Sequence, residues 1–291
     1  MARKYRHSTF TVINGILLAV LAFLIIYPVW YTFLISISRY QDAPNVVLWT
    51  KHVDFSAYKT VVEGRGFIRA FFNSMFITVV GVIINLIITS MTAYALSQPK
   101  WAGKSIFMLF VLIPMFFSGG LIPYYLTIKS LRLVNSIWVM ILPNAMNTFY
   151  MLILMNCFKS IPASLAESAR LDGASDFSIL FRIILPVSKP TISAIGLFYA
   201  VERWNEWWHG LLFINDLDKY PLQLVLREMI FNIDSYINNA MASSIVEGIR
   251  NVYAPSLKMA TVMIAAIPIM IVYPFLQKNF TKGIMIGAIK G

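Results

Sequence analysis

Long apolar runs separated by shorter polar segments dominate the pattern of the chain. A helix needs about 20 mostly apolar residues to cross the hydrocarbon core of a bilayer. Six runs have that length, and they cover residues 13–37, 71–97, 105–126, 136–158, 190–214 and 257–277. None shows the two-residue alternation of a membrane-spanning β-strand. The pattern therefore predicts an all-α polytopic membrane protein with six transmembrane helices.

The composition agrees with a membrane environment. The 291 residues are 58% hydrophobic and 13% charged, with a mean hydropathy of +0.70. A soluble domain is roughly half apolar and a quarter charged. The basic start "MARKYRHS" is followed by an apolar run without a small-residue cleavage site, so we expect a retained first span instead of a signal peptide. Because internal repeats and low-complexity tracts are missing, residues 1–291 are predicted to form a single transmembrane domain.

Charge and motifs argue against several kinds of chemistry. The net charge of +11 is spread over many segments without a nucleic-acid motif, so no nucleic-acid partner is expected. The single cysteine, Cys157, cannot form an internal disulfide or a multi-cysteine metal cluster. "AGKS" at 102–105 looks like the end of a phosphate-binding loop, but Gln98 stands where that loop needs its first glycine. We expect no nucleotide-binding motif, cofactor, metal or enzymatic activity in this chain.

The polar segment 159–189 is patterned as two short helices. Ser160 can cap the first helix, Gly173 can end it in a left-handed conformation, and Ser175 can cap the second. Two interpretations are open at this point. The segment is either an amphipathic hairpin that lies on the membrane or a docking element for another protein.

A family resemblance favours docking. The stretch "AESARLDGASDFSILFRIILP" resembles the EAA loop of the membrane subunits of ABC importers, in which Glu-Ala-Ala is followed by a glycine and later by Leu-Pro. Ser168 replaces the usual alanine of the second position, which exchanges one small residue for another. The residues that carry the match in order and spacing, with Ser168 among them, are Glu167, Ser168, Ala169, Asp172, Gly173, Ala174, Leu185 and Pro186.

Other segments are similar to the sugar-importer branch of this family, the MalG-like permeases. They are "NSMFITVVG", "TAYALS", "FFSGGLIPYYL", "YPLQLVLR" and "GIMIGAIKG". The resemblance covers nearly the whole chain and includes the LplC/YtcP-type permeases for complex oligosaccharides. It implies a transmembrane permease subunit that translocates an oligosaccharide with energy from ATP hydrolysed by partner subunits.

The resemblance also implies an orientation and a set of partners. It makes segment 159–189 a cytoplasmic coupling hairpin between spans four and five, with both termini cytoplasmic in a bacterial inner membrane. The nearly even distribution of Lys and Arg between the two sides does not decide this. The implied partners are a second related permease, two ATPase subunits that would bind ATP and magnesium, and an external solute-binding protein facing loop 215–256. Lys290 and Gly291 of the tail are expected to contact the ATPase pair.

The stretch "VERWNEWWHG" at 201–210 places polar side chains in the outer half of the predicted fifth span. A charged residue at the bilayer centre costs about 3 kcal/mol even on lenient scales, so these side chains should not face lipid. On a continuous helix one face would carry Glu202, Asn205, Glu206 and His209, and Arg203 could pair with either carboxylate. We expect the substrate path to be lined by Arg203, Trp204, Asn205, Glu206 and His209.

Alternatives exist for the same stretch. Trp207 and Trp208 could belong to an aromatic belt at the interface, and the charges could form a structural pair between spans. Spacing also permits a metal site from three side chains, and a proton-coupled carrier or a membrane-embedded enzyme could use the same three as relay groups. They are Glu202, Glu206 and His209.

The chemical class of the substrate follows less directly from the sequence. The predicted external segments carry more Lys and Arg than Asp and Glu. Arg203 and His209 lie near the expected path. These charges favour an acidic oligosaccharide, a polyuronate such as alginate, with a neutral oligosaccharide as the alternative.

Overall fold

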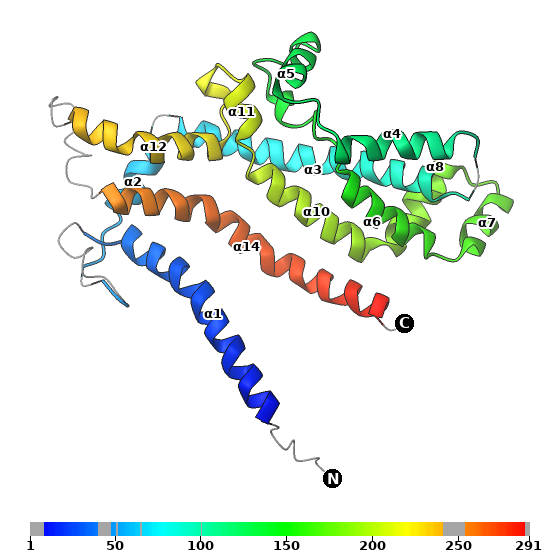
Figure 1. Cartoon of the computed structure of the whole chain (residues 1–291), viewed down its shortest axis with the longest axis horizontal. Coiled ribbons are helices and arrows are strands. Elements are labelled where there is room, and N and C mark those ends of the chain that lie inside the picture. The colour runs from blue at the N-terminus through cyan, green and yellow to red at the C-terminus, as the bar shows by residue number, and fades with distance from the viewer. Residues whose placement is uncertain are drawn as a thin grey trace. The chain divides into compact units, whose positions relative to one another are not determined.

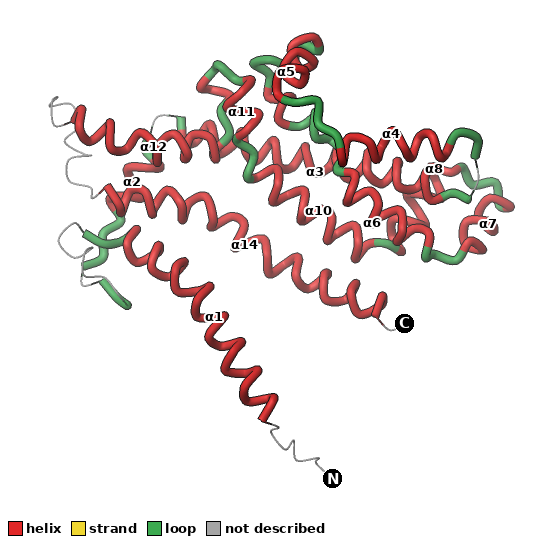
Figure 2. Tube along the Cα trace, viewed as in Figure 1, coloured by secondary structure: helices red, strands yellow, loops and turns green. Residues whose placement is uncertain are grey.

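The computed structural model describes residues 9–39, 48–50, 52–64, 66–99, 101–240 and 254–288, and their regular elements are helices (Figure 2). The helical fold class is therefore confirmed for the part of the chain that is described. An isolated bridge pairs Ser38 with Val53. The chain divides into two compact units, Met1–Arg65 with Leu226–Ile267 and Gly66–Val225 with Pro268–Gly291.

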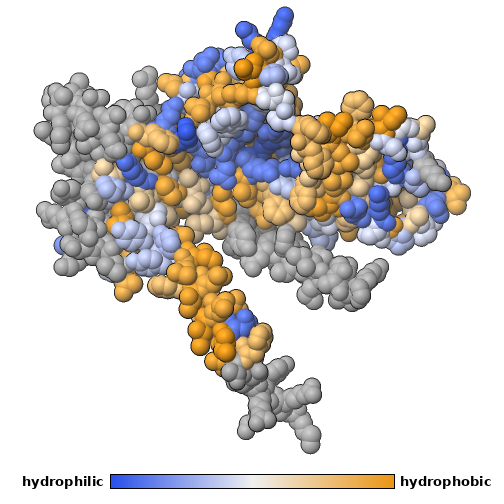
Figure 3. Space-filling view, in the orientation of Figure 1, coloured by the Kyte–Doolittle hydropathy of each residue, from blue (hydrophilic) through white to orange (hydrophobic). Residues whose placement is uncertain are grey.

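The first unit contains α1 (Thr9–Ser36) and α2 (Ser56–Val62) (Figure 1). Two further helices, α12 (Leu222–Ala240) and α14 (Ala254–Ala288), each have residues in both units. Most of α1 is apolar and exposed, as its orange surface in Figure 3 shows, which is the pattern of a helix made for lipid. Its C-terminal end is fixed within the unit, because Leu34 packs near Met259.

The second unit is built around three helices that pack on one another (Figure 1): α3 (Phe67–Ser97), α6 (Thr148–Lys159) and α10 (Lys189–Trp204). The buried face of α3 repeats about every four residues and is made largely of small or polar side chains. Its members include Ala70, Ser74, Ile77, Gly81, Asn85, Thr89 and Ala93. Small residues let helix backbones approach closely in a membrane, where packing drives association.

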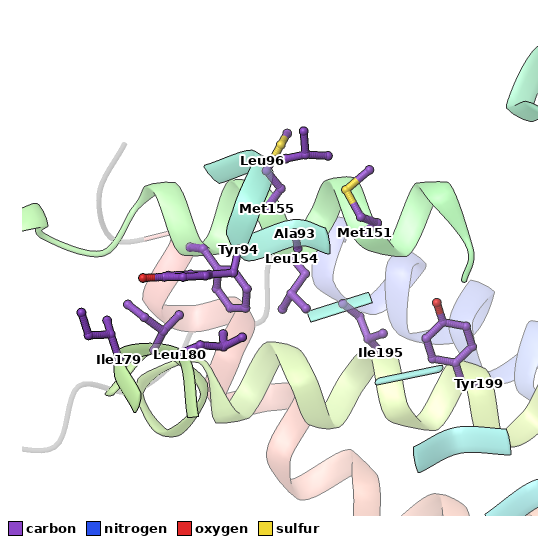
Figure 4. Close-up of a cluster of buried hydrophobic side chains, with 12 residues drawn as sticks. Ala93, Tyr94, Leu96, Met151, Leu154, Met155, Ile179, Leu180, Ile195 and Tyr199 are labelled. Carbon is purple, nitrogen blue, oxygen red and sulfur yellow. The ribbon is translucent and has the colours of Figure 1, made fainter. Parts of the chain in front are cut away.

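An apolar cluster holds these three helices together at one end (Figure 4). Its buried members come from α3, α6, α10 and the segment after Gly173. They are Ala93, Tyr94, Leu96, Met151, Leu154, Met155, Phe158, Ile179, Leu180, Ile184, Ile195 and Tyr199. The polar hairpin thus shares a core with the apolar helices, so it is packed firmly against them.

Among the described residues, three helices are long and apolar enough to cross a membrane: Phe10–Ser36, Phe67–Ser97 and Ala254–Ile271. They correspond to the predicted spans 13–37, 71–97 and 257–277. Two helix pairs bent by 74° and 88° would raise the number to five if each were one span. The count of six spans stays a prediction.

The other three predicted runs are not continuous helices, which corrects the sequence pattern. Run 105–126 is divided into α4 (Lys104–Phe116) and α5 (Leu121–Ser130). Gly120 has φ +83° and ψ 172°, an extended conformation with positive φ that favours glycine and that a helix cannot continue through. In run 136–158 a short 3₁₀ helix, Ile137–Met140, precedes α6, and Asn147 caps α6 by accepting from the backbone N–H of Phe149 at 2.9 Å.

Run 190–214 is likewise divided, into α10 and α11 (Trp208–Phe213). The break at 205–207 falls on the polar stretch itself. The segment expected as external loop 215–256 also contains a 3₁₀ turn, Leu217–Lys219, and α12. The apolar runs therefore did not predict where individual helices begin and end.

Candidate functional site

The predicted coupling hairpin has the expected local structure with one correction. Helix α7 (Ala163–Leu171) is followed by Gly173 at φ +84°. Ser175 then caps α8 (Asp176–Ile179), accepting from the N–H of Ser178 at 3.3 Å. A π-helical turn, Leu180–Ile184, and α9 (Leu185–Val187) lead into α10. Ser160 ends α6 and does not cap α7, because Pro162 stands directly before α7.

A polar clamp ties this hairpin to α3. The guanidinium of Arg170 donates from Nη2 to Gln98 Oε1 and to Asp176 Oδ1, both at 3.0 Å. The hydroxyl of Tyr94 donates to the same Asp176 oxygen at 3.4 Å. The hydrogen bond to the Asp176 carboxylate raises the pKa of Arg170 above its usual value. Hairpin and helix end are therefore connected by directed bonds as well as by the apolar cluster.

The residues of the EAA-type pattern divide into an exposed and a packed set. Exposed residues are Glu167, Ser168, Asp172, Gly173 and Pro186. Ala169, Ala174 and Leu185 are partly buried against the apolar cluster. Between the exposed polar groups lies Leu171, whose side chain is 89% exposed. The exposed set, together with Leu171, therefore presents polar groups and one apolar side chain at the surface of the hairpin.

At the other predicted site, Arg203 is buried and bound by backbone carbonyls. Its Nη1 donates to the carbonyl of Met140 at 2.7 Å and its Nη2 donates to the carbonyl of Asn144. When the Asn85 amide is oriented to donate to the Gly81 carbonyl, its oxygen accepts from Nε of Arg203 at 3.3 Å. This arrangement joins α10 to α3 and to the segment before α6.

Gly81 makes room for this side chain. A Cβ at position 81 would lie 3.1 Å from Cδ of Arg203 and 3.2 Å from its Cγ. The stem of Arg203 therefore passes directly over the α3 backbone. Even the Cβ of an alanine at position 81 would require the Arg203 stem to shift by a few tenths of an ångström.

Glu206 pairs with His209, and not with Arg203 as the sequence suggested. One carboxylate oxygen accepts from the backbone N–H of His209 at 3.0 Å, and the other lies 3.0 Å from His209 Nδ1. The hydroxyl of Tyr124 lies 2.8 Å from His209 Nε2. The carboxylate thus accepts from one of the backbone N–H groups that have no helical partner in the first turn of α11. Both ring nitrogens of His209 are engaged, so α11 is linked to α5.

The remaining residues of the stretch differ in exposure. Trp204 is buried and meets the ring of Phe71 edge-on at a centroid distance of 6.0 Å. Asn205 is exposed, and its Nδ2 donates to the carbonyl of Val201 at 2.8 Å. Glu202 is exposed and accepts from the Tyr150 hydroxyl at 2.6 Å. The predicted shared face is wrong, because the helix ends before Asn205.

Of the five predicted path residues, Asn205 alone is exposed, while Arg203, Trp204, Glu206 and His209 are buried within the chain. The sequence analysis missed Tyr150, Asn85 and Gly81. The available signal for Asn85 was that it is a polar residue within the apolar run 71–97. Among the described residues, no group of three His, Cys, Asp or Glu side chains is placed to hold a metal ion. The tail residues Lys290 and Gly291 lie outside the described part of the chain.

A network of backbone bonds fixes the segment after α11. Asn135, at φ +59°, accepts at 3.2 Å through its side-chain oxygen from the N–H groups of Asn215 and Asp216. Ser74 of α3 accepts from the N–H of Leu222 at 2.8 Å. The pKa of Asp216 is lowered, first by the backbone N–H of Asp218 and then by Lys219. The start of the segment predicted as an external loop is therefore ordered.

Comparisons with known proteins show the family of the chain. The family described as "Binding-protein-dependent transport system inner membrane component" matches residues 86–286. The chain belongs to this family, whose members are ABC transporter permeases and not enzymes. Its helices therefore belong to a membrane protein.

Individual relatives cover most of the chain. Protein LplC of Bacillus subtilis (strain 168) is 42% identical over 246 residues, 84% of this chain and 81% of its own. The polygalacturonan/rhamnogalacturonan transport system permease protein YtcP of the same strain is 40% identical, over 81% of both chains. A chain from the crystal structure of a bacterial ABC transporter involved in importing the acidic polysaccharide alginate matches with a TM-score of 0.85 and 31% identity. That match covers 96% of this chain and 99% of the other.

Proposed function

We propose that the chain is the transmembrane permease subunit of an ABC importer that moves oligosaccharides across a bacterial inner membrane. Family membership and the names of the relatives support the class of cargo. The observation that carries the proposal is the exposed hairpin, which shares a core with the membrane helices. In this proposal the six spans of the sequence analysis cross the bilayer, and some of them are broken helices.

The hairpin 159–189 would couple ATP hydrolysis in the partner ATPase subunits to movement of the membrane helices. It lies in the cytoplasm and docks on an ATPase subunit through its exposed set, with Glu167 as the charged contact. ATP and magnesium bind in two such partner subunits. The hairpin and the membrane helices share one apolar core, and the Arg170 clamp connects them as well. A movement of the hairpin would therefore be transmitted directly to α3 and α10, because no flexible linker separates them.

The remaining partners follow from the same topology. A second related permease would complete the path, and an external solute-binding protein would deliver the cargo to segment 215–256. Both termini would be cytoplasmic, with Lys290 and Gly291 near the ATPase pair. The ordered segment around Asn135 and Asp216 would give the binding protein a fixed surface.

For the substrate path we propose a division of labour within 201–210. Asn205 would face the path, together with the neighbouring carboxylate of Glu202. The four buried residues would hold that surface in place: Arg203, Trp204, Glu206 and His209. A carboxylate accepts hydrogen bonds from sugar hydroxyls, and an amide can both accept from them and donate to them.

Two classes of oligosaccharide fit this path. The relatives named for alginate and for polygalacturonan support an acidic cargo. The placement of charges supports a neutral one, because Glu202 is exposed and Arg203 is enclosed by carbonyl groups. Both classes share the same mechanism of coupling.

Two hairpin variants test the proposal. Glu167→Lys reverses the exposed charge, and Gly173→Pro cannot adopt the left-handed φ that ends α7. Each variant should insert normally yet lose most of the ATPase stimulation that the loaded binding protein produces in the assembled complex. Asp172→Asn serves as a milder comparison, because it removes an exposed charge in the same turn without changing the volume of the side chain. It should lose less of the ATPase stimulation than the two main variants. Full stimulation in both main variants would contradict the proposed coupling.

A further inference from the structure

Two stacked aromatic rings, Tyr150 and Phe198, lie beside Glu202 in the second unit and are called the aromatic step below. Tyr150 of α6 stacks on Phe198 of α10, with ring centroids 5.6 Å apart and planes 16° apart. Phe198 is 40% exposed. The edge of Tyr199 meets Tyr150 at 5.0 Å and 88°. Stacked and edge-on contacts of this kind hold aromatic rings in fixed orientations.

Buried hydrogen bonds immobilise the base of this step. The Tyr199 hydroxyl lies 2.7 Å from Thr89 Oγ1 and accepts from the N–H of Asn147 at 2.9 Å. Tyr199 is fully buried (Figure 4). Three elements, α3, α10 and the start of α6, are thus joined beneath an exposed phenyl ring. The step is prearranged, so a ligand that binds on it does not have to order it.

Glu202 borders the step and has spare acceptor capacity. The Tyr150 hydroxyl occupies Oε1 at 2.6 Å. The other carboxylate oxygen has no partner among the residues that the structure describes. Glu202 is exposed although it belongs to an apolar helix of a membrane permease. A carboxylate in that position needs water or a polar ligand, since lipid cannot solvate it.

The charge of this surface is one-sided. The neighbouring cation, Arg203, points to the carbonyls of Met140 and Asn144 and is 3% exposed. It therefore cannot pair with an anionic group on the exposed side. Arg203 interacts electrostatically with Glu202 from the buried side, but it stays out of reach of a ligand on the exposed side. A negative ligand at this place would therefore meet the Glu202 carboxylate directly, and like charges repel.

We propose that Tyr150, Phe198 and Glu202 form a subsite for an uncharged sugar ring, and the inference rests on the proposed import of oligosaccharides. The C–H face of the ring lies on Phe198, and a ring hydroxyl donates to the second oxygen of Glu202. Tyr150 is a positioning residue, because its hydroxyl sets the direction of the carboxylate. A uronate ring is disfavoured here by the Glu202 charge, even in a cargo that carries uronates elsewhere.

A matched pair of probes tests the charge preference. One probe is an oligogalacturonate tetramer, and the other is the same tetramer with its carboxyl groups reduced to alcohols. Their binding to the purified permease–ATPase complex, without the solute-binding protein, is measured by saturation-transfer NMR. The wild-type complex should bind the reduced tetramer several-fold more tightly. Glu202→Gln should abolish that preference by strengthening binding of the uronate.

Two further variants separate the subsite from general damage. Phe198→Ala should weaken binding of the reduced tetramer. The control variant is Glu63→Gln, which removes an exposed carboxylate that pairs with Lys59 in the other unit, and it should change the binding of neither probe. The subsite is overturned if the wild-type complex prefers the uronate or binds neither probe, or if Glu202→Gln leaves the preference unchanged. ATP-driven oligosaccharide import by that same complex would still support the proposed function, so the two failures are distinguishable.

Discussion

At the scale of single residues, Arg203 shows how a charge is accommodated among apolar helices. Its guanidinium reaches two backbone carbonyls and the Asn85 amide over a glycine. A planar fork can donate to several acceptors at fixed angles, whereas an ammonium is a single point of charge. The residue therefore serves as a cross-link between helix α10 and the segment before α6.

Arg203→Lys should destabilise the assembled complex although it keeps the charge. Lysine cannot donate to both carbonyls from one planar group, and each unpaired buried acceptor costs about 1–3 kcal/mol. The melting temperature should fall clearly below that of wild type. Arg182→Lys, at an exposed position, is the matched control. Equal melting of the Arg203→Lys and wild-type complexes would show that the fork geometry is not needed.

The pairing of charges at 201–210 could not be read from residue spacing. Spacing on one helix brought Arg203 close to both carboxylates, but the helix ends at Trp204 and α11 begins at Trp208. Glu206 instead binds His209 at the start of α11. Arg203 donates to the carbonyl groups of Met140 and Asn144, which are distant in sequence. Contacts of that range depend on tertiary packing, which a single sequence does not display.

At the scale of elements, the hairpin is the part that local sequence signals predicted best. Gly173 takes the predicted left-handed conformation, and Ser175 caps the second helix as expected. Turn and cap chemistry is local, so the sequence contains it. The ends of the apolar runs were predicted less well, because hydrophobicity continues across the breaks at Gly120 and at 205–207.

The Arg170–Asp176 clamp should matter for coupling more than for stability. Exposed ion pairs contribute about 0–1 kcal/mol, so Arg170→Glu should hardly lower the melting temperature. It should nevertheless reduce the substrate moved per ATP, because the hairpin loses its directed bonds to α3 and α8. The exchange Arg170→Asp with Asp176→Arg should restore part of that ratio.

Arg182→Glu in the same hairpin is the control for the clamp, since it reverses an exposed charge that is outside the network. Transport and ATP hydrolysis are measured on the same reconstituted preparation. A normal ratio in Arg170→Glu would remove the clamp from the coupling pathway. An equal loss in Arg182→Glu would attribute the effect to hairpin charge in general.

At the scale of the whole molecule, the proposed topology places the hairpin in the cytoplasm and segment 127–135, between the third and fourth predicted spans, outside. Cys157 is the sole cysteine, so a Cys157→Ser background allows single cysteines to be introduced. In intact cells an impermeant maleimide should label Leu131→Cys and leave Ser168→Cys unlabelled until the membrane is opened. Both native positions are exposed. The reverse labelling pattern would invert the proposed orientation.

The family was recognisable from sequence because its most distinctive motif is short and continuous. The EAA-type spacing from Glu167 to Pro186 needs no tertiary information. The aromatic step at Tyr150 and Phe198 could not be predicted in this way, because its two rings lie on α6 and α10 and meet only after packing. Motifs within one element are thus visible in a sequence, and sites shared between helices are not.

ATP-driven uptake into proteoliposomes tests the central claim most directly. The permease is reconstituted with its partner permease and ATPase subunits, ATP is enclosed, and the solute-binding protein is added outside with a labelled oligosaccharide mixture. We predict that oligosaccharide accumulates inside only when ATP and the binding protein are both present. Accumulation that persists without ATP, or no accumulation with every partner present, would contradict the account.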